Sequence, residues 1–204
     1  KINAAKKSII SPVDGKIMEF GTIDKNTLIQ AKGKTYALES FLEDAEYAKK
    51  FNNGSFITIY LAPKNYHRIH SPVSGKITGY QYIPGSLFCV NKTSSEIVDN
   101  LFSKNERLIT YISTQKGAIA VAKIGACVVG KIRATYENAV FNTSCNTKLK
   151  KTYSKKIPIK KGAQIGMFEI GSTVVLLFEK NIVIFDKLAR NQELKMGQKI
   201  GAFQ

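Results

Sequence analysis

The sequence predicts a mainly β protein (α+β): a pseudo-duplicated, barrel-sandwich-like β-architecture with one or two short helices, in a single domain over residues 1–204. Three observations lead to this fold class. Short β-branched and aromatic runs recur between Gly, Pro, Asn and Ser residues, only one long stretch has helical character, and one seven-residue motif occurs twice. The composition, with 44% hydrophobic and 23% charged residues, is that of a globular protein.

Eight runs are expected to be strands because apolar or alternating residues end at turn-forming residues. They cover 16–20, 55–61, 76–82, 108–113, 118–124, 127–134, 173–178 and 182–185. The stretch 40–51 is expected to be a helix, since acids occupy its first turns, lysines its last turn, and Asn-Asn-Gly follows it. A second, shorter helix is expected over 94–102, and the polar, basic stretch 142–156 is expected to be a loop.

The repeated motif is Ser-Pro-Val-Asp-Gly-Lys-Ile at 11–17, which returns as Ser-Pro-Val-Ser-Gly-Lys-Ile at 71–77. Proline fixes one backbone dihedral and glycine adopts the unusual one, so each copy is expected to form a turn that leads into a strand. Only the change from Asp14 to Ser74 separates the two copies. The repeat predicts two related halves, of which the first alone carries an acid in its turn.

The charge balance indicates an anionic partner, although a lysine-rich proteome would produce the same excess. The formal net charge is +16, and 27 of the 31 basic residues are lysine. Lysines crowd the segment 148–161, where Tyr153 is the only aromatic residue. An anionic lipid surface is therefore favoured over nucleic acid, which calls for arginine and interleaved aromatics.

Three classes of protein are disfavoured by simple counts. No apolar run reaches the roughly 20 residues that a membrane-spanning helix needs. Cys89, Cys127 and Cys145 are odd in number, far apart and without a Cys-x-x-Cys pair. We therefore expect neither a disulfide framework nor a zinc site, and a reducing compartment fits best.

Candidate catalytic residues stand at three places in the chain. His67 and His70 follow a predicted strand, where a single helical turn would place both rings on one face. Gly171-Ser172 directly precedes an apolar strand. Together with Asp14, these residues provide the groups of a Ser-His-Asp triad, in which the acid orients the imidazole and the imidazole accepts the hydroxyl proton. The Gly-x-Ser-x-Gly elbow of α/β-hydrolases is absent, and no residue set has the spacing of a metal site.

Further motifs extend this set over nearly the whole chain. They are Ser-Pro-Val-Asp-Gly at 11–15, Tyr-Ala-Leu-Glu-Ser-Phe-Leu at 36–42, Tyr-His-Arg-Ile-His at 66–70, Tyr-Ile-Pro-Gly-Ser-Leu-Phe-Cys-Val-Asn at 82–91, Asn-Leu-Phe-Ser-Lys-Asn-Glu-Arg at 100–107, Val-Gly-Lys-Ile at 129–132 and Gly-Ser-Thr at 171–173. In this order and spacing, the sequence resembles the pyruvoyl-dependent phosphatidylserine decarboxylases of the bacterial type.

The resemblance implies a proenzyme that cuts itself. Ser172 Oγ would attack the carbonyl of Gly171, with His70 as the base and Asp14 as its orienting partner. Residue 172 would then become a pyruvoyl group, the covalent cofactor of the family. That group would form a Schiff base with the amine of phosphatidylserine and accept electrons as carbon dioxide departs, leaving phosphatidylethanolamine.

The resemblance also implies the products, partners and location of the enzyme. Cleavage would give a β-chain of 1–171 and an α-chain of 172–204, and His67 would assist decarboxylation or reprotonation. The implied partners are phosphatidylserine, an anionic membrane surface and a second copy of the chain, without nucleic acid or metal. The implied location is peripheral, on the cytoplasmic face of the cell membrane, and the membrane-docking helical segment of the family is expected upstream of residue 1.

Two alternatives remain open from the residues. A decarboxylase of another serine phospholipid, such as archaetidylserine, would use the same headgroup chemistry. A non-enzymatic lipoyl-like or phosphohistidine carrier or binding module would suit the duplicated turns. A lipoyl carrier, however, needs a modifiable lysine at a hairpin tip, which is absent, and a phosphohistidine carrier has no use for Ser172.

Overall fold

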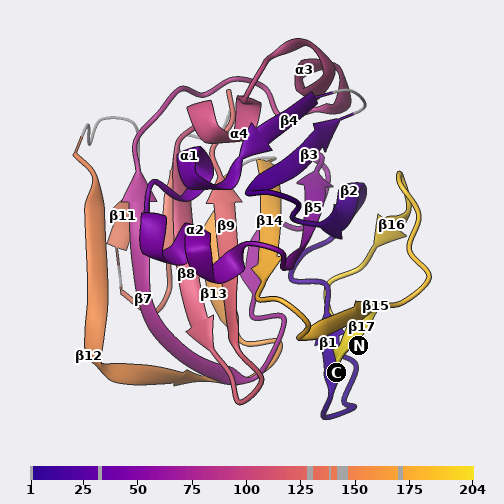
Figure 1. Cartoon of the computed structure of the whole chain (residues 1–204), viewed down its shortest axis with the longest axis vertical. Coiled ribbons are helices and arrows are strands. Elements are labelled where there is room, and N and C mark those ends of the chain that lie inside the picture. The colour runs from indigo at the N-terminus through magenta and orange to yellow at the C-terminus, as the bar shows by residue number, and fades with distance from the viewer. Residues whose placement is uncertain (1, 32–33, 128–130, 138, 142–146, 170–171) are drawn as a thin grey trace.

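A computed structural model shows a mainly β molecule and describes residues 2–31, 34–127, 131–137, 139–141, 147–169 and 172–204 (Figure 1). Its centre, within those residues, is an eight-stranded antiparallel sheet. The strands run in the order β12 (Leu149–Ile159), β7 (Gly75–Ile83), β8 (Arg107–Ser113), β9 (Ala118–Ile124), β14 (Ser172–Phe178), β5 (Ser55–Leu61), β2 (Gly15–Thr22) and β16 (Glu193–Leu194). The expected fold class is confirmed, and the strands 55–61 and 118–124 match their predicted bounds.

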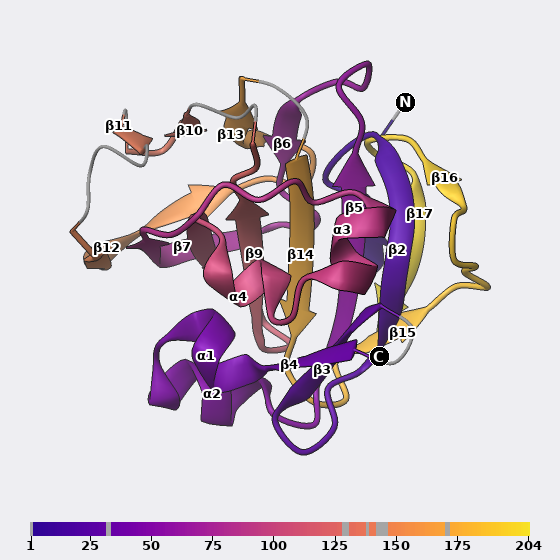
Figure 2. The ribbon, with the colours of Figure 1, turned by 90° about the horizontal axis from the view of Figure 1, so that it is seen from above.

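Smaller sheets and short helices surround the large sheet. One small sheet holds β1 (Ser8–Ile10), β17 (Lys199–Phe203) and β15 (Val183–Phe185), and another holds β11 (Ala139–Phe141), β10 (Ile132–Ala134), β13 (Gln164–Phe168) and β6 (Arg68–His70). The remaining elements are the hairpin β3 (Thr27–Ala31) and β4 (Lys34–Ala37) and the helices α1 (Leu38–Leu42), α2 (Ala45–Phe51), α3 (Lys92–Ile97) and α4 (Leu101–Lys104). Figure 2 shows α1, α2 and the hairpin on one side of the molecule and β6, β10 and β13 on the opposite side.

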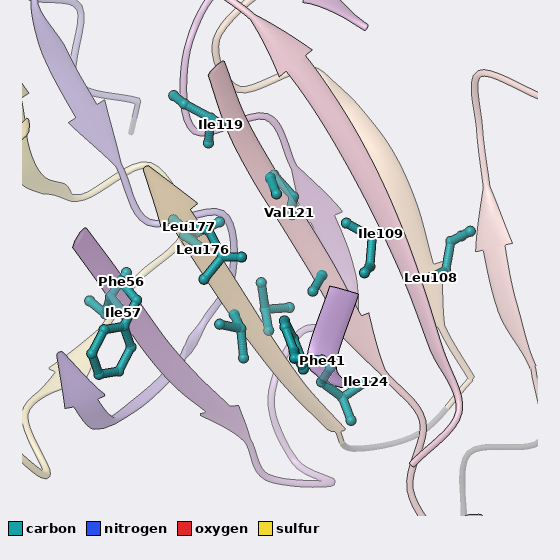
Figure 3. Packing of buried hydrophobic residues seen from close by; sticks show 14 of the residues in the cluster. Phe41, Phe56, Ile57, Leu108, Ile109, Ile119, Val121, Ile124, Leu176 and Leu177 are labelled. Atoms are coloured by element: carbon teal, nitrogen blue, oxygen red, sulfur yellow. The ribbon is translucent and has the colours of Figure 1, made fainter. Parts of the chain in front are cut away.

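The core lies around the two middle strands of the large sheet. Every residue of β9 and β14 is buried, which is why both read as nearly continuous apolar runs. Figure 3 shows Val121 of β9 and Leu176 and Leu177 of β14 among the side chains of this core, together with Phe41 of α1. Ser172 is therefore the first residue of a strand that packing holds firmly on both faces.

The predicted duplication is confirmed by the register of the strands. In the first half Lys16 of β2 pairs with Tyr60 of β5, and in the second half Lys76 of β7 pairs with Ser113 of β8. Each pair of strands has a bulge at the same place, after Ile17 and after Ile77. The order of the large sheet is symmetric about its β9–β14 centre, so that β7, β8 and β12 correspond to β2, β5 and β16.

The two repeated turns also bond to each other. The amide of Ile10 donates to the carbonyl of Pro72 at 3.1 Å, and the amide of His70, sixty positions after Ile10, donates to the carbonyl of Pro12 at 2.9 Å. Within each turn the serine hydroxyl donates to the valine carbonyl two residues later, at 2.7 Å in both copies. The halves are thus related by a pseudo-two-fold axis, and the second turn holds the backbone of His70 beside the first.

Each of the two predicted helices is divided into two shorter helices in the structure. The stretch 40–51 is two helices rather than one, because Glu43 has a left-handed φ of 46° that ends α1. Asp44 then caps α2 by accepting hydrogen bonds from the amides of Glu46 and Tyr47, both at 3.1 Å. The stretch 94–102 is likewise divided between α3 and α4. The two histidines do not share a helical turn, the arrangement considered from their spacing, since β6 begins at Arg68.

The prediction of a loop over 142–156 is wrong for its second part. Residues 142–146 lie outside the described residues, but β12 begins at Leu149 and pairs with β7 at the edge of the sheet. An edge strand exposed to solvent accommodates lysines without burying them, so periodicity gives no strand signal. Of the expected strand 127–134, the structure describes β10 as its final part, while 128–130 are outside the described ranges.

The expectation that no disulfide forms is also contradicted, because Cys89 and Cys127 are bonded to each other. They are 38 positions apart in sequence, but the fold joins the segments that carry them. The side-chain amide of Asn105 donates to the carbonyls of Phe88 and Gly125, both at 2.8 Å, which brings the two segments together. Cys145 lies outside the described residues, and no helix among those described is long and apolar enough to cross a membrane.

Candidate active site

Ser172 stands at one end of the large sheet. It is fully buried and pairs with Leu61, the last residue of β5. Its hydroxyl donates to the backbone carbonyl of Ile124 at the end of β9. Gly171, the residue on the other side of the predicted cleavage bond, lies outside the described residues. In this arrangement the hydroxyl proton of Ser172 is directed at a peptide carbonyl, not at a side-chain base.

His70 ends β6 with both ring nitrogens in hydrogen-bond contact. Its Nδ1 is 2.8 Å from the carbonyl oxygen of Gly162, which can only accept, so Nδ1 carries the proton in the neutral ring. Nε2 then carries the lone pair and accepts from the hydroxyl of Tyr66 at 3.2 Å. The rings of Tyr66 and His70 stack with centroids 5.7 Å apart. His70 is therefore held in the tautomer that leaves Nε2 as the basic atom.

Asp14 caps a neighbouring turn. One carboxylate oxygen accepts from the amide of Met196 at 2.8 Å, and the other contacts the ammonium of Lys195 at 3.3 Å. Its counterpart in the second half, Ser74, accepts from the amide of Lys161 at 3.0 Å in the same way. No hydrogen bond between Asp14 and His70 occurs among the contacts of the described residues, although the amide of His70 bonds to Pro12 close by.

His67 is partly buried and has a ring nitrogen without a hydrogen-bond partner among the described residues. Nε2 is inaccessible to solvent and has no hydrogen-bond partner in the described part of the chain. Burial lowers the pKa of His67, because it disfavours the charged ring, and a backbone contact with Asn65 opposes this only in part. A neutral imidazole with a free, enclosed nitrogen can accept or deliver a proton.

Strand register places Ser172 and the turn that carries Asp14 at the same end of the sheet, and the segment with His67 and His70 continues the chain from that end of β5. Ser172 pairs with Leu61, and His67 and His70 follow that residue closely in the chain. Asp14 precedes β2, whose Lys16 pairs with Tyr60 next to Leu61. A pocket of about 120 Å³ opens there, with lysines in its lining: Lys16, Lys64 and Lys195. The direct Ser172–His70–Asp14 hydrogen bonds are not made in this arrangement.

The structure adds two residues that sequence reasoning did not assign to a site. Tyr66 caps the basic nitrogen of His70, and only its place beside the two histidines could have pointed to it. Lys123 is fully buried within β9, its ammonium donates to Thr110 Oγ1, and burial lowers its pKa to about 7. Lys123 pairs with Val174, two residues after Ser172, so Lys123 and Ser172 share a face of the sheet. The signal in the sequence was a single lysine inside an apolar strand.

Comparison with known proteins agrees over the whole chain. The family model for phosphatidylserine decarboxylase matches residues 1–202. A phosphatidylserine decarboxylase proenzyme of Myxococcus xanthus is 43% identical over 201 residues, which cover 98% of this chain and 71% of that protein. Proenzymes of the same name from Brevibacillus brevis and Coxiella burnetii are 43% and 44% identical over 94% and 87% of this chain, and 69% and 63% of those proteins. The resemblance seen in the motifs is confirmed, and the chain belongs to the phosphatidylserine decarboxylase family.

Proposed function

We propose that the chain is a self-processing, pyruvoyl-dependent enzyme that converts phosphatidylserine to phosphatidylethanolamine and carbon dioxide. The observation that carries the proposal is the position of Ser172, which begins a buried strand at the end of the sheet where Asp14, His67 and His70 also lie. The names of the relatives favour phosphatidylserine over archaetidylserine as the substrate. No contact in the described residues favours the carrier alternative.

Self-cleavage follows from the chemistry of these groups. Ser172 Oγ bonds to the carbonyl carbon of Gly171 while the amide bond between the two residues breaks. Nε2 of His70 takes the hydroxyl proton and returns it to the leaving nitrogen. For this step the Ser172 hydroxyl must leave the Ile124 carbonyl, and the Tyr66 hydroxyl must leave Nε2. Asp14 can contribute negative charge near His70 once its contact with Lys195 loosens.

The second stage frees the two chains. A base takes the Cα proton of residue 172 while the bond between Cβ and the ester oxygen breaks, which leaves a Cα=Cβ double bond and releases the carboxylate of chain 1–171. Hydrolysis of the remaining enamine, with loss of ammonia, leaves a pyruvoyl group at the start of chain 172–204.

The surroundings of residue 172 fit such a group. The position is fully buried, and the unpaired Nε2 of His67 lies in the enclosed region at the same end of the sheet. A pyruvoyl group supplies an electrophilic carbonyl that withdraws electrons from a bound amine. His67, kept neutral by burial, can hold or deliver the proton that replaces carbon dioxide on the product. Lys64, at the rim of the small pocket, can pair with the phosphate of the lipid.

The substrate is a lipid, so we place the enzyme at the cytoplasmic face of the cell membrane as a peripheral homodimer. The net charge of +16 supports attraction to anionic lipid. Sedimentation equilibrium of the purified chain should give twice the mass of one copy.

Intact-mass measurement under denaturing conditions tests the proposal. We expect two fragments that divide between Gly171 and Ser172, the smaller lighter by one ammonia than a chain that begins with serine, and carbon dioxide release from phosphatidylserine. Ser172→Ala should remain one chain without activity. Full-length mass and no carbon dioxide release from the unaltered chain would refute self-processing, and an active Ser172→Ala chain would refute the pyruvoyl chemistry.

A further inference from the structure

Several lysines of the lysine-rich segment 148–161 already have partners. Within 148–161, Lys148 pairs with Glu43, Lys150 with Asp44 and Lys151 with Glu137. The ammonium of Lys161 is turned inward and donates to the carbonyl of Ala5 and the hydroxyl of Ser8, both at 2.6 Å. Acidic side chains, backbone carbonyls or a hydroxyl therefore bind the ammonium groups of these four lysines.

Lysines that form no ion pair with any described residue gather around a pocket of about 750 Å³. We call it the five-lysine pocket, after Lys6, Lys7, Lys76, Lys116 and Lys156. Its other lining residues are polar or small apart from Phe203, and none is acidic. None of the five lysines forms an ion pair with any residue in the described ranges. Five like charges around one cavity repel each other, and a bound anion relieves that repulsion.

The position of this pocket follows from the pseudo-two-fold axis. The amide of Phe168 donates to the carbonyl of His67 at 3.0 Å, and the amide of Phe203 donates to the carbonyl of Lys7 at 2.9 Å. Lys7 is therefore the counterpart of His67, sixty positions earlier in the chain. By the same offset Lys6 is the counterpart of Tyr66.

The counterpart of Ser172 lies next to the pocket as well. Tyr60 pairs with Thr173, and its counterpart Ser113 pairs with Ala118. Ala118 thus corresponds to Thr173, and Gly117, beside the pocket residue Lys116, corresponds to Ser172. Ser74, the counterpart of Asp14, lines the pocket directly.

The five-lysine pocket is thus the second copy of the catalytic end of the fold, at the opposite end of the sheet. At about 3.3 Å per residue, the length of β9 and β14 separates Gly117 from Ser172 by roughly 20 Å. Each reactive group has been replaced: the nucleophile by glycine, the acid by serine, and the two histidines by lysine and isoleucine. The cavity is retained without the means of bond cleavage.

We propose that the five-lysine pocket is a binding site for a phosphate-bearing anion, separate from the site of decarboxylation. Ammonium groups recognise phosphate oxygens through charge-assisted hydrogen bonds, and several of them together favour a group with two or more negative charges. The ligand is bound and released unchanged. The phosphate belongs either to a soluble compound or to a lipid headgroup, and the two sources are separated by experiment. The proposal does not depend on self-cleavage.

Calorimetric titration with inorganic pyrophosphate, at about 0.15 M ionic strength, tests the soluble source. The double variant Lys76→Gln/Lys116→Gln should bind pyrophosphate about tenfold more weakly than the unaltered chain. The matched control is Lys180→Gln/Lys187→Gln, which removes the same charge from exposed lysines outside the pocket and should bind within about twofold of it. Unchanged decarboxylation by all three proteins would keep this site distinct from the catalytic one.

Flotation with phosphatidylcholine vesicles, with and without phosphatidic acid, tests the lipid source. Loss of flotation by the pocket variant alone, with no pyrophosphate binding by any protein, would assign the site to a lipid headgroup phosphate. The proposal is overturned if pocket and control variants behave alike in both assays, since net charge alone would then account for any binding. It is also overturned if neither probe binds the unaltered chain.

Discussion

At the scale of single residues, the base proposed for self-cleavage is held by a peptide carbonyl and a phenol. The Gly162 carbonyl fixes the proton on Nδ1 of His70, and the Tyr66 hydroxyl occupies the lone pair of Nε2. Tyr66→Phe keeps the stacked ring and removes the competing donor. Because one such hydrogen bond contributes about 1 kcal/mol, the variant should cut itself about fivefold faster.

A time course of chain cleavage on denaturing gels measures this effect, with His70→Gln as the variant that should not cut. A Tyr66→Phe chain that cuts several times more slowly would contradict the prediction. It would mean that the phenol orients His70 for catalysis instead of blocking its basic nitrogen.

The buried Lys123 predicts a pH-dependent stability. Its pKa is about 7 in the fold against 10.5 in an unfolded chain, so between these values the unfolded state binds more protons. The free energy of unfolding should therefore rise with pH over this window, by up to about 1.4 kcal/mol per pH unit. Lys123→Met lacks the titrating group and should lack this rise.

Urea denaturation at about pH 7.5 and about pH 9.5, in an uncut Ser172→Ala background, compares the two slopes. Lys25→Met, an exposed lysine, serves as the control and should keep the rise of the parent chain. Equal pH dependence of the Lys123 and Lys25 variants would show that Lys123 is not the group responsible.

At the scale of elements, the disulfide ties the segment after β7 to the end of β9, next to the carbonyl that holds Ser172. The bond closes a loop with a sequence separation of 38, and a crosslink of this kind contributes about 2–4 kcal/mol. Cys89→Ser should lower the urea midpoint of the uncut chain, and a reducing agent should have the same effect on the parent but none on the variant. Three reactive thiols in the native, unreduced protein would contradict the prediction.

How well the sequence predicts an element depends on whether the side chains of that element are buried. The strands β5 and β9 are mostly apolar because most of their side chains are buried, and the sequence places their ends correctly. The sequence does not predict β12, because its side chains show no strand pattern. It is a strand because its backbone pairs with β7 at an exposed edge of the sheet. The break between α1 and α2 depends on the backbone of Glu43, which no pattern of apolar residues reports.

At the scale of the whole molecule, the sequence predicts the duplication and the catalytic end of the fold, but not the related pocket at the other end. The repeat at 11–17 and 71–77 is visible because its turns need the same residues in both halves. The catalytic end is visible because Ser172 and the histidines lie within specific motifs. The five-lysine pocket is invisible in the chain, because its residues come from separate segments and share with their counterparts only a place in the fold.

The pseudo-two-fold axis also supplies a matched pair of glycines, Gly162 and Gly197, each with positive φ, at 79° and 86°. Alanine at either position should destabilise the uncut chain by about 1–2 kcal/mol, since the left-handed region is costly for a residue with Cβ. The carbonyl of Gly162 holds Nδ1 of His70, whereas the counterpart of His70 in the other half is Ile10, whose side chain has no proton to donate. Gly162→Ala should therefore slow self-cleavage by about tenfold, which corresponds to about 1.4 kcal/mol, and Gly197→Ala should leave its rate nearly unchanged.

Cleavage half-times and urea midpoints, measured on the same two variants, separate the catalytic effect from the structural one. Equal loss of stability with unequal cleavage rates is the result expected from a carbonyl that positions the base. If both variants slow cleavage to the same extent, strain spreading through the duplicated frame explains the effect, and the contact between Gly162 and His70 has no special part in self-cleavage.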